Sequence, residues 1–249
     1  MSSEFEGPRT AIVTGGARRI GEVLCRALAG DGWHLLIHCN RSVEQAEALA
    51  QELGNSGVVS AELGSPEVAR QVMDAAHDLP PVKLLINNAS QFIHDSADDF
   101  TVEGWDRHQA VNLRAPALLT QAFARQSNGG GLIINLLDSK LQHPNPDFFT
   151  YTLSKMGLAG LTELTARAYA EKKVRVCGIA PSVTLVSGPQ SRENFDQVHS
   201  MNALGRGVRV EEIVAAMRFI IATPTLTGQT IALDGGQRFL GLSRDVQFL

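Results

Sequence analysis

A tyrosine and a lysine lie four residues apart in the segment Tyr151-Thr152-Leu153-Ser154-Lys155. If this segment is helical, the phenol and the ammonium share one face, because residues i and i+4 are neighbours on a helix. A nearby cation favours the tyrosinate, so we expect Lys155 to lower the pKa of Tyr151 from about 10 and prepare it for proton exchange with a substrate. The alternative is a surface pair worth about 0.2–0.5 kcal/mol.

A glycine-rich segment, Thr14-Gly15-Gly16-Ala17-Arg18-Arg19-Ile20-Gly21, follows the first apolar run of the chain. Glycines let the backbone turn sharply and approach a phosphate, and the start of the next helix offers unpaired N–H groups and partial positive charge. The segment therefore fits a dinucleotide site placed between a strand and a helix. Taken alone, it fits a tight turn that merely begins a helix equally well.

The end of the second apolar run indicates which dinucleotide is bound. An acid about 20 residues past the glycine turn selects NAD, whereas a base there accommodates the extra phosphate of NADP. The segment His38-Cys39-Asn40-Arg41-Ser42 has no carboxylate, but its arginine and serine suit a phosphate dianion. We therefore predict NADP(H) as the cofactor. The alternative is that Ser42 only caps the following helix and Arg41 is a solvated charge.

These segments need a scaffold that brings them to one edge of the molecule. Short apolar runs without clean alternation are typical of parallel strands buried on both faces, and amphipathic stretches separate them here. We predict one doubly wound α/β domain over residues 1–249, a Rossmann fold with a seven-stranded parallel sheet and helices on both faces. The runs are Thr10–Val13, Trp33–His38, Val58–Glu62, Lys83–Asn87, Leu132–Leu137, Val174–Ile179 and Thr230–Leu233.

Local signals predict several helix ends and one long connection. Gly30-Asp31-Gly32 closes the first helix, Ser42-Val43-Glu44-Gln45 fits a capping box, and Ser65-Pro66-Glu67 starts a further helix. Residues 181–209 are too long for an ordinary connection and contain Gly188, Pro189, Gly205 and Gly207. We expect a mobile substrate flap over the carboxyl ends of the strands, with a disordered insertion as the alternative.

Composition excludes several classes of protein. The 249 residues are 44% hydrophobic, with a net charge of −4, which indicates a soluble globular protein without a broad nucleic-acid or membrane surface. Cys25, Cys39 and Cys177 have no CxxC spacing, so we predict reduced, buried thiols and no metal site. The first eight residues lack the pattern of a secretory signal, and no apolar run approaches the roughly 20 residues of a membrane helix. The expected location is the cytoplasm.

Several motifs in register make nearly the whole chain resemble the short-chain dehydrogenase/reductase family: TGGARRIG, Asn87-Asn88-Ala89, Asn112, YTLSK and Pro181. The resemblance implies that Tyr151 is the general acid, Lys155 holds the nicotinamide ribose and Asn112 supports a proton-relay water. It also implies a homotetramer, with close helix packing between subunits at Gly157 and Gly160. The implied cofactor contacts are Gly15, Arg18, Arg19, Ile20, Gly21, His38, Asn40, Arg41, Ser42, Glu62, Leu63, Asn88, Ala89, Lys155, Pro181 and Val183.

Two departures from the family pattern resemble its pteridine reductase branch, which includes dihydromonapterin reductases. Arg19 replaces the middle glycine of the turn, and Asp138 replaces a serine thirteen residues before the tyrosine. The HxxRS run ending at Ser42 and the NNASxF run from Asn87 to Phe92 agree with the same branch. The resemblance implies that Phe92 stacks on the pterin, Ser90 bonds its edge and Arg19 touches both pyrophosphate and pterin, with Asp138 and Tyr151 completing the substrate site.

The chemistry of a pterin is consistent with these residues. Reduction of a C=N bond needs a proton on a ring nitrogen, which Asp138 beside Tyr151 can supply or relay, and a flat ring suits an aromatic wall such as Phe92. Taken singly, Phe92 fits loop packing, Asp138 a turn cap and Arg19 a charge that complements the helix region.

We therefore expect NADPH-dependent reduction of a dihydropterin, of the dihydromonapterin, dihydrobiopterin or dihydrofolate type. The main alternative is an NADP-dependent carbonyl or 3-oxoacyl thioester reductase that uses the same Tyr151 and Lys155. A cofactor-sensing binding protein without turnover is a third possibility, but it has no use for a tuned acid.

Overall fold

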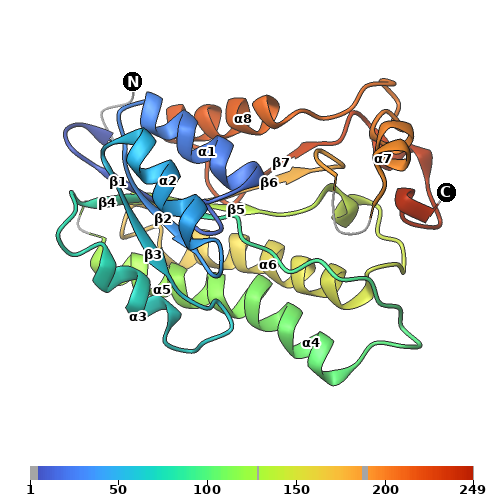
Figure 1. The fold of residues 1–249 in the computed structure, drawn as a ribbon, viewed down its shortest axis with the longest axis horizontal. Helices are drawn as coiled ribbons and strands as arrows, with labels where there is room; N and C mark the ends of the chain where they lie inside the picture. Colours follow the sequence, from blue (N-terminus) through green and yellow to red (C-terminus); the bar gives the residue numbers. More distant parts are fainter. Residues whose placement is uncertain (1–4, 128, 187–189, 249) are drawn as a thin grey trace.

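The computed structural model of the chain describes residues 5–127, 129–186 and 190–248, and its centre is one parallel sheet (Figure 1). The seven strands pair in the order β3-β2-β1-β4-β5-β6-β7, so the chain reverses its direction of growth between β1 and β4. This arrangement confirms the predicted fold class. The strands are β1 (Thr10–Val13), β2 (His34–Cys39), β3 (Ser56–Ser60), β4 (Val82–Asn87), β5 (Gly131–Leu136), β6 (Val174–Pro181) and β7 (Thr230–Leu233).

Helices cover both faces of this sheet (Figure 1). One face packs against α1 (Arg19–Gly30), α2 (Val43–Leu53) and α8 (Val210–Ala222). The other face lies against α3 (Val68–Ala75), α4 (Val102–Gln109), the π-helical turn η2 (Ala110–Arg114), α5 (Ala115–Gln126) and α6 (Phe149–Ala168). The short elements are η3 (Ser139–Gln142), α7 (Arg192–His199), η4 (Gln237–Leu240) and η5 (Val246–Phe248).

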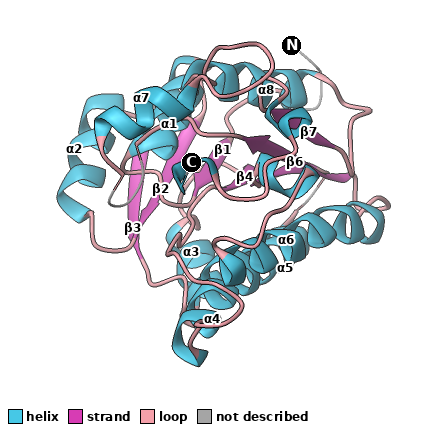
Figure 2. Ribbon diagram, turned by 90° about the vertical axis from the view of Figure 1, so that its right-hand side faces the viewer, coloured by secondary structure: helices cyan, strands magenta, loops and turns pink. Residues whose placement is uncertain are grey.

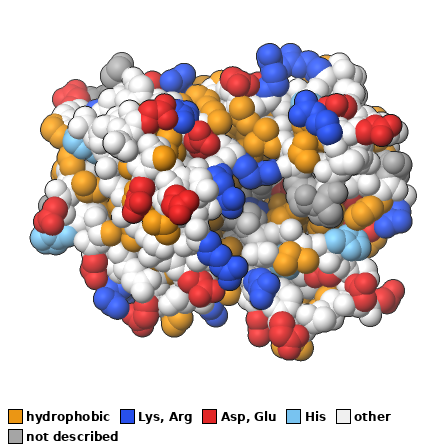
Figure 3. Space-filling view, viewed as in Figure 1, with side chains coloured by type: hydrophobic (Ala, Val, Ile, Leu, Met, Phe, Trp, Pro, Cys, Tyr) orange, Lys and Arg blue, Asp and Glu red, His pale blue; other side chains and the backbone are white. Residues whose placement is uncertain are grey.

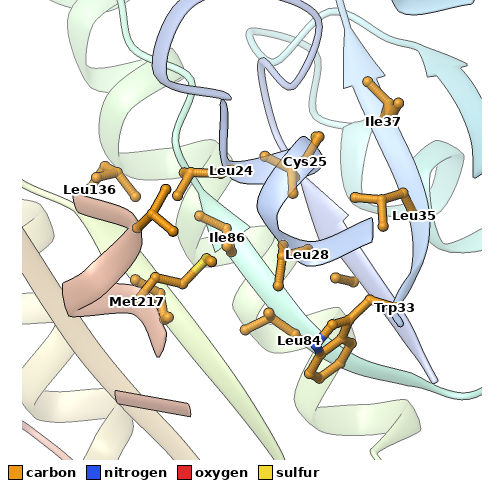
Figure 4. Close-up of a cluster of buried hydrophobic side chains, with 14 of the residues drawn as sticks. Leu24, Cys25, Leu28, Trp33, Leu35, Ile37, Leu84, Ile86, Leu136 and Met217 are labelled. Atoms are coloured by element: carbon orange, nitrogen blue, oxygen red, sulfur yellow. The ribbon is translucent and has the colours of Figure 1, made fainter. Parts of the chain in front are cut away.

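The core is built from the apolar face of each helix and from strands that are apolar on both faces. In Figure 4, Leu24 and Leu28 of α1 lie beside Ile86 of β4, with Met217 of α8 closing the cluster. Every residue of β1 and β5 is buried. Because helices cover both faces, the central strands have no solvent-exposed side, which explains why their sequences do not alternate.

All seven predicted strands form; β1 and β7 have the predicted bounds, and the bounds of the other five shift by one or two residues. The largest shift is at the edge strand β3, which runs over Ser56–Ser60 rather than Val58–Glu62. The first helix ends at Gly30 as predicted, with the Asp31 N–H donating to the Ala27 carbonyl at 3.0 Å. Each of the three cysteines is buried, as predicted.

Two predicted helix starts were wrong in detail. The helix α2 begins at Val43, but the Ser42 side chain makes no capping hydrogen bond, so there is no capping box. The helix α3 begins only at Val68, because Ser65 forms a separate turn in which its Oγ accepts from the Glu67 N–H at 3.2 Å.

The long connection of residues 181–209 contains a helix that the sequence analysis did not predict. After β6 ends at Pro181, α7 forms over Arg192–His199 and lies near the C-terminal end of the chain (Figure 1). Gly188 and Pro189 lie outside the described residues, and mobility of the flap stays a prediction. Among the helices of the described chain, none combines the length and the apolar character needed to span a bilayer.

Candidate active site

A cleft of about 940 Å³ opens at the carboxyl edge of the sheet. Figure 2 looks onto this edge, and Figure 3 shows Lys and Arg side chains gathered around a hollow near the middle of one face. Segments that follow β1, β2, β4, β5 and β6 line the cleft together with the C-terminal segment. Of the residues predicted to bind cofactor or substrate or to act in catalysis, the structure brings all to this cleft except Asn112.

The turn between β1 and α1 depends on its glycines. Gly15 has a φ of +62°, and its N–H donates to His38 Nδ1 at 3.2 Å. A Cβ on Gly21 would lie 2.1 Å from the Gly15 carbonyl oxygen, so no larger residue fits there without movement of the backbone. Asn88 holds the same turn from β4, because its Nδ2 donates to the carbonyl of Thr14 at 2.8 Å.

His38 joins this turn to the neighbouring strand. Its Nε2 lies 3.0 Å from the Ala61 carbonyl oxygen, while its Nδ1 accepts from Gly15. Burial lowers the pKa of His38 to about 4, so the ring is neutral at pH 7 and carries its proton on Nε2. The residue thus acts as a neutral hydrogen-bonded bridge at the wall of the cleft.

Three exposed arginines line the cleft without a side-chain hydrogen bond or ion pair to any described residue: Arg18, Arg41 and Arg107. The first two were predicted, whereas Arg107 of α4 was not. Arg19 differs from them, because its backbone is left-handed, with φ +57°, and its Nη1 donates to the Val186 carbonyl at 2.5 Å. It therefore connects the glycine turn to the long segment after β6.

Tyr151 and Asp138 form the central pair of the cleft. The Tyr151 hydroxyl donates to Asp138 Oδ2 at 2.7 Å, and the backbone N–H of Lys140 donates to Asp138 Oδ1 at 2.8 Å. Burial, followed by the Asp138 charge and hydrogen bond, raises the pKa of Tyr151 well above its usual range. The expected lowering of this pKa by Lys155 is wrong for this structure.

Lys155 is itself affected by burial. Its Nζ donates to the Leu136 carbonyl at 2.6 Å and lies 5.8 Å from the centre of the Tyr151 ring. Desolvation lowers the pKa of Lys155 to about 8, and the Asp138 charge opposes that change. Lys155 therefore does not hold a tyrosinate here, and Tyr151 keeps its proton.

Asn112 lies behind the cleft wall, in the π-helical turn η2. Its Oδ1 accepts from the Gln91 N–H at 2.7 Å, and its Nδ2 donates to the Gln91 carbonyl at 2.9 Å and to Ser154 Oγ at 3.0 Å. These bonds fix the segment that carries Ser90 and Phe92. Asn112 thus positions the wall of the cleft, and its support of a relay water stays a prediction.

Aromatic rings form a continuous row along the substrate side. The Phe92 ring stacks on Phe148 with centres 4.1 Å apart and meets the Tyr151 ring edge-on at 4.7 Å. The Phe148 ring in turn stacks on Phe248 at 5.8 Å. Phe92 was predicted from the sequence, but Phe148 and Phe248 were not, because they belong to no motif.

One end of the cleft was not predicted from the sequence. It is lined by His143 and Asn145, which precede α6, and by part of the C-terminal segment. Asn145 Oδ1 is buried without a hydrogen-bond partner among the described residues. From the C-terminal segment the lining residues are Leu242, Arg244, Asp245, Val246 and Gln247.

The two glycines predicted to allow close packing between subunits differ in their surroundings within the chain, and the subunit contact itself stays a prediction. A Cβ on Gly157 would lie 2.6 Å from the Leu113 side chain of η2, so this glycine allows two elements of the same chain to pack closely. Gly160 faces open space, with nothing described within 4 Å of such a Cβ.

Comparisons with known proteins agree with this geometry. Residues 9–197 match the family model described as short chain dehydrogenase. The structure is similar to FolM Alternative dihydrofolate reductase 1 from Brucella canis complexed with NADP, with TM-score 0.91 and 37% identity, covering 96% of this chain and 97% of that one. It is also similar to the protein so described from Brucella suis in complex with NADP, with TM-score 0.88 and 39% identity, covering 94% and 96%.

Relatives by sequence are more diverse. The probable galactose dehydrogenase GalD of Rhizobium meliloti (strain 1021) is 29% identical over 251 residues, covering 94% of this chain and 98% of that protein.

Proposed function

The chain belongs to the short chain dehydrogenase family of oxidoreductases, and from that premise we propose that it reduces a dihydropterin with NADPH. The observation that carries the proposal is the hydrogen bond from the Tyr151 hydroxyl to Asp138 Oδ2, 2.7 Å long, inside the cleft. A carboxylate beside the phenol suits proton delivery to a ring nitrogen. Similarity to two proteins described as alternative dihydrofolate reductases supports the same substrate class.

The residues present fit an NADP dinucleotide. The glycine turn lets backbone approach a pyrophosphate, and a larger residue at Gly21 would collide with the Gly15 carbonyl oxygen. Arg18 and Arg41 supply cationic donors that no described carboxylate neutralises, which matches a phosphate-rich ligand. Both similar Brucella proteins were crystallised with NADP.

When bound, NADPH supplies the hydride, and the chain must supply the proton. Tyr151 holds that proton, because its raised pKa keeps the phenol protonated and its O–H points to Asp138. In the reaction the phenol O–H bond breaks and an N–H bond forms at the ring nitrogen, either directly or with Asp138 Oδ2 passing the proton on. The Lys155 ammonium, 5.8 Å from the ring centre, stabilises the phenolate that remains.

The rest of the cleft suits a flat ring that carries N–H donors. The Phe92 ring, backed by Phe148, offers an aromatic wall 4.7 Å from the Tyr151 ring. Asn145 Oδ1 offers a buried acceptor that has no described partner, which an N–H of the substrate would satisfy. We assign Ser90 and Arg19 to the edge of the pterin, with Arg19 released from Val186 to reach it.

A carbonyl or 3-oxoacyl thioester reductase is the second candidate, because Tyr151 and Lys155 suit a carbonyl oxygen equally and relatives such as the galactose dehydrogenase act on other substrates. Neither a ketone nor a thioester has a ring nitrogen for the Asp138 pair to protonate. Asp138 therefore favours the pterin.

The test is oxidation of NADPH by the purified protein with dihydropterins, dihydrofolate, simple ketones and 3-oxoacyl thioesters. We expect the highest kcat/KM with a dihydropterin. Asp138→Asn should lower that kcat by roughly 100-fold, which is the usual contribution of a proton donor, and leave the Kd for NADPH unchanged. Asp98→Asn, at an exposed loop carboxylate, is the matched control. Brisk ketone or thioester reduction without pterin turnover would overturn the proposal.

A further inference from the structure

The C-terminal segment, residues 242–248, is held against the loop that precedes α6 by hydrogen bonds from Arg244 and Asp245 to Asp147, which we call the clasp. Arg244 donates to both carboxylate oxygens of Asp147, from Nη2 at 2.9 Å and from Nε at 3.2 Å. The backbone N–H of Asp245 donates to the same carboxylate at 2.8 Å. Asp147 is only 6% exposed, whereas the Arg244 side chain is 54% exposed, so a buried carboxylate receives a guanidinium that reaches it from the surface.

Lys140 connects this clasp to the Tyr151–Asp138 pair. Its ammonium donates to the Asp147 carbonyl at 2.5 Å and lies 3.3 Å from Asp245 Oδ2, while its backbone N–H donates to Asp138 Oδ1 at 2.8 Å. The Lys140 and Asp245 side chains are 9% and 15% exposed. Lys140 thus links the carboxylates of Asp138 and Asp245, and all three residues line the cleft.

We infer that Lys140 and Asp245 are positioning residues for the Tyr151–Asp138 proton donor, so that the C-terminal segment is a working part of the active site. The inference rests on the proposed function only in taking Tyr151 as the donor. Asp245 reaches the site from 94 residues further along the chain than Tyr151, and nothing in its local sequence marks it.

Asp245 is surrounded by charged and titratable groups from several elements. Lys140 and Asp138 face it from the segment after β5, Arg244 precedes it, and Tyr151 faces it from α6. Asp147 contacts its backbone, and His94 Nε2 lies 4.0 Å from Asp147. Burial and the Asp138 charge raise the pKa of Asp245, and Lys140 opposes them.

When ionised, Asp245 raises the pKa of Tyr151. Because the Lys140 ammonium pairs with Asp245 at 3.3 Å, we expect it to offset part of this effect. Removing either charge should therefore move the titration of Tyr151, and the two removals should move it in opposite directions. A loss of packing alone would not shift the titration of Tyr151 in opposite directions in the two variants.

The experiment measures the ionisation of Tyr151 directly, without a substrate. The chain has two tyrosines, so 3-fluorotyrosine in a Tyr169→Phe background leaves one ¹⁹F resonance, and its loss in Tyr151→Phe assigns it. The pH at which this resonance first begins to move should be lower by roughly 0.5 pH unit or more in Asp245→Asn and higher in Lys140→Met than in the wild type. Asp78→Asn, at a fully exposed side chain, should leave it unchanged.

A second measurement tests the consequence for turnover. With a dihydropterin, Asp245→Asn and Lys140→Met should each lower kcat by roughly 10-fold and leave the KM for NADPH unchanged. The inference would be overturned if the onset of the Tyr151 titration did not move in either variant, or moved in the same direction in both. If Asp245→Asn fails to fold, Lys140→Met still tests the inference, since this variant must move the onset of the Tyr151 titration to higher pH. An enzyme that turns over no pterin would refute the proposed function. The ¹⁹F titration would still test whether Lys140 and Asp245 position the Tyr151–Asp138 pair.

Discussion

At the scale of single residues, the site depends on where protons are held. Tyr151 remains protonated because it is buried and donates to Asp138, and His38 remains neutral because it is buried between Gly15 and Ala61. Both states follow from desolvation, which always disfavours the charged form. Their surroundings thus widen the pH range in which the two residues stay uncharged, toward higher pH for Tyr151 and toward lower pH for His38.

The neutral state of His38 predicts a pH-dependent stability. Its pKa is about 4 in the folded protein and 6.5 in the unfolded chain, so between these values the unfolded chain binds more protons. The contribution of His38 is therefore complete above pH 6.5 and is lost as the pH falls toward 4. From pH 7.5 to pH 5 the free energy of unfolding should fall by about 2 kcal/mol on account of this residue.

Urea unfolding at the two pH values checks this expectation. His38→Gln, which keeps a polar side chain but does not titrate, should remove about 2 kcal/mol of the difference. His77→Gln is the control, because the His77 side chain is 86% exposed and should leave the difference unchanged. An equal pH dependence in wild type and His38→Gln would contradict the assignment.

Arg41 carries a second prediction at this scale. Its guanidinium lines the cleft without a described partner, so it is available to a phosphate. Arg41→Asp should lower kcat/KM for NADPH by roughly 100-fold and raise the relative use of NADH, because the new carboxylate repels a phosphate and accepts from a ribose hydroxyl. Competition between the two cofactors measures it, and Arg192→Asp on α7 is the control. Unchanged discrimination would count against this site.

At the scale of elements, the first strand, turn and helix act as one unit. The turn from β1 into α1 closes only because Gly21 has no side chain, whereas a Cβ on Gly30, at the end of the same helix, would meet no described atom within 4 Å. A side chain is therefore excluded by close contact at Gly21 but would be accommodated at Gly30 of the same helix.

These two positions give a matched pair of variants. Gly21→Ala should lower the free energy of unfolding by about 1–3 kcal/mol through overpacking and weaken NADPH binding, because the turn must open. Gly30→Ala should be neutral or stabilising, by up to about 1 kcal/mol, since alanine favours the helix. Thermal unfolding and an NADPH titration measure both variants. Equal effects of the two substitutions would show that the contact with Gly15 does not govern the turn.

At the scale of the whole molecule, exposed apolar side chains lie on both helical layers. Leu164 of α6 is 68% exposed and Phe219 of α8 is 54% exposed, and these helices cover opposite faces of the sheet (Figure 1). An exposed apolar side chain on each layer suits two kinds of subunit contact, as in a tetramer of D₂ symmetry. We therefore propose that the chain forms a homotetramer.

Sedimentation tests the assembly. The mass in solution should be about four times the 26.8 kDa of the chain. Leu164→Glu and Phe219→Glu should each reduce it to a dimer, because each places a charge in one of the two interfaces. Leu204→Glu, at an exposed leucine outside the helices, is the control. A monomer at micromolar concentration would refute the tetramer.

The amino-acid sequence by itself determined the features that depend on local spacing. The apolar runs predicted all seven strands, and the glycine turn, Arg41 and the Tyr151–Lys155 spacing predicted residues that meet in one cleft. Such patterns predict structure because residues close together in the chain are also close together in a strand, turn or helix.

The tertiary structure alone decided what depends on distant contacts. The protonation of Tyr151 reverses the expectation from its sequence neighbour Lys155, because burial and Asp138 outweigh that cation. The clasp between Arg244 and Asp147 joins residues 97 apart, and the row from Phe92 to Phe248 spans more than half the chain. Desolvation and long-range pairing arise only when the chain is folded, so no local pattern records them.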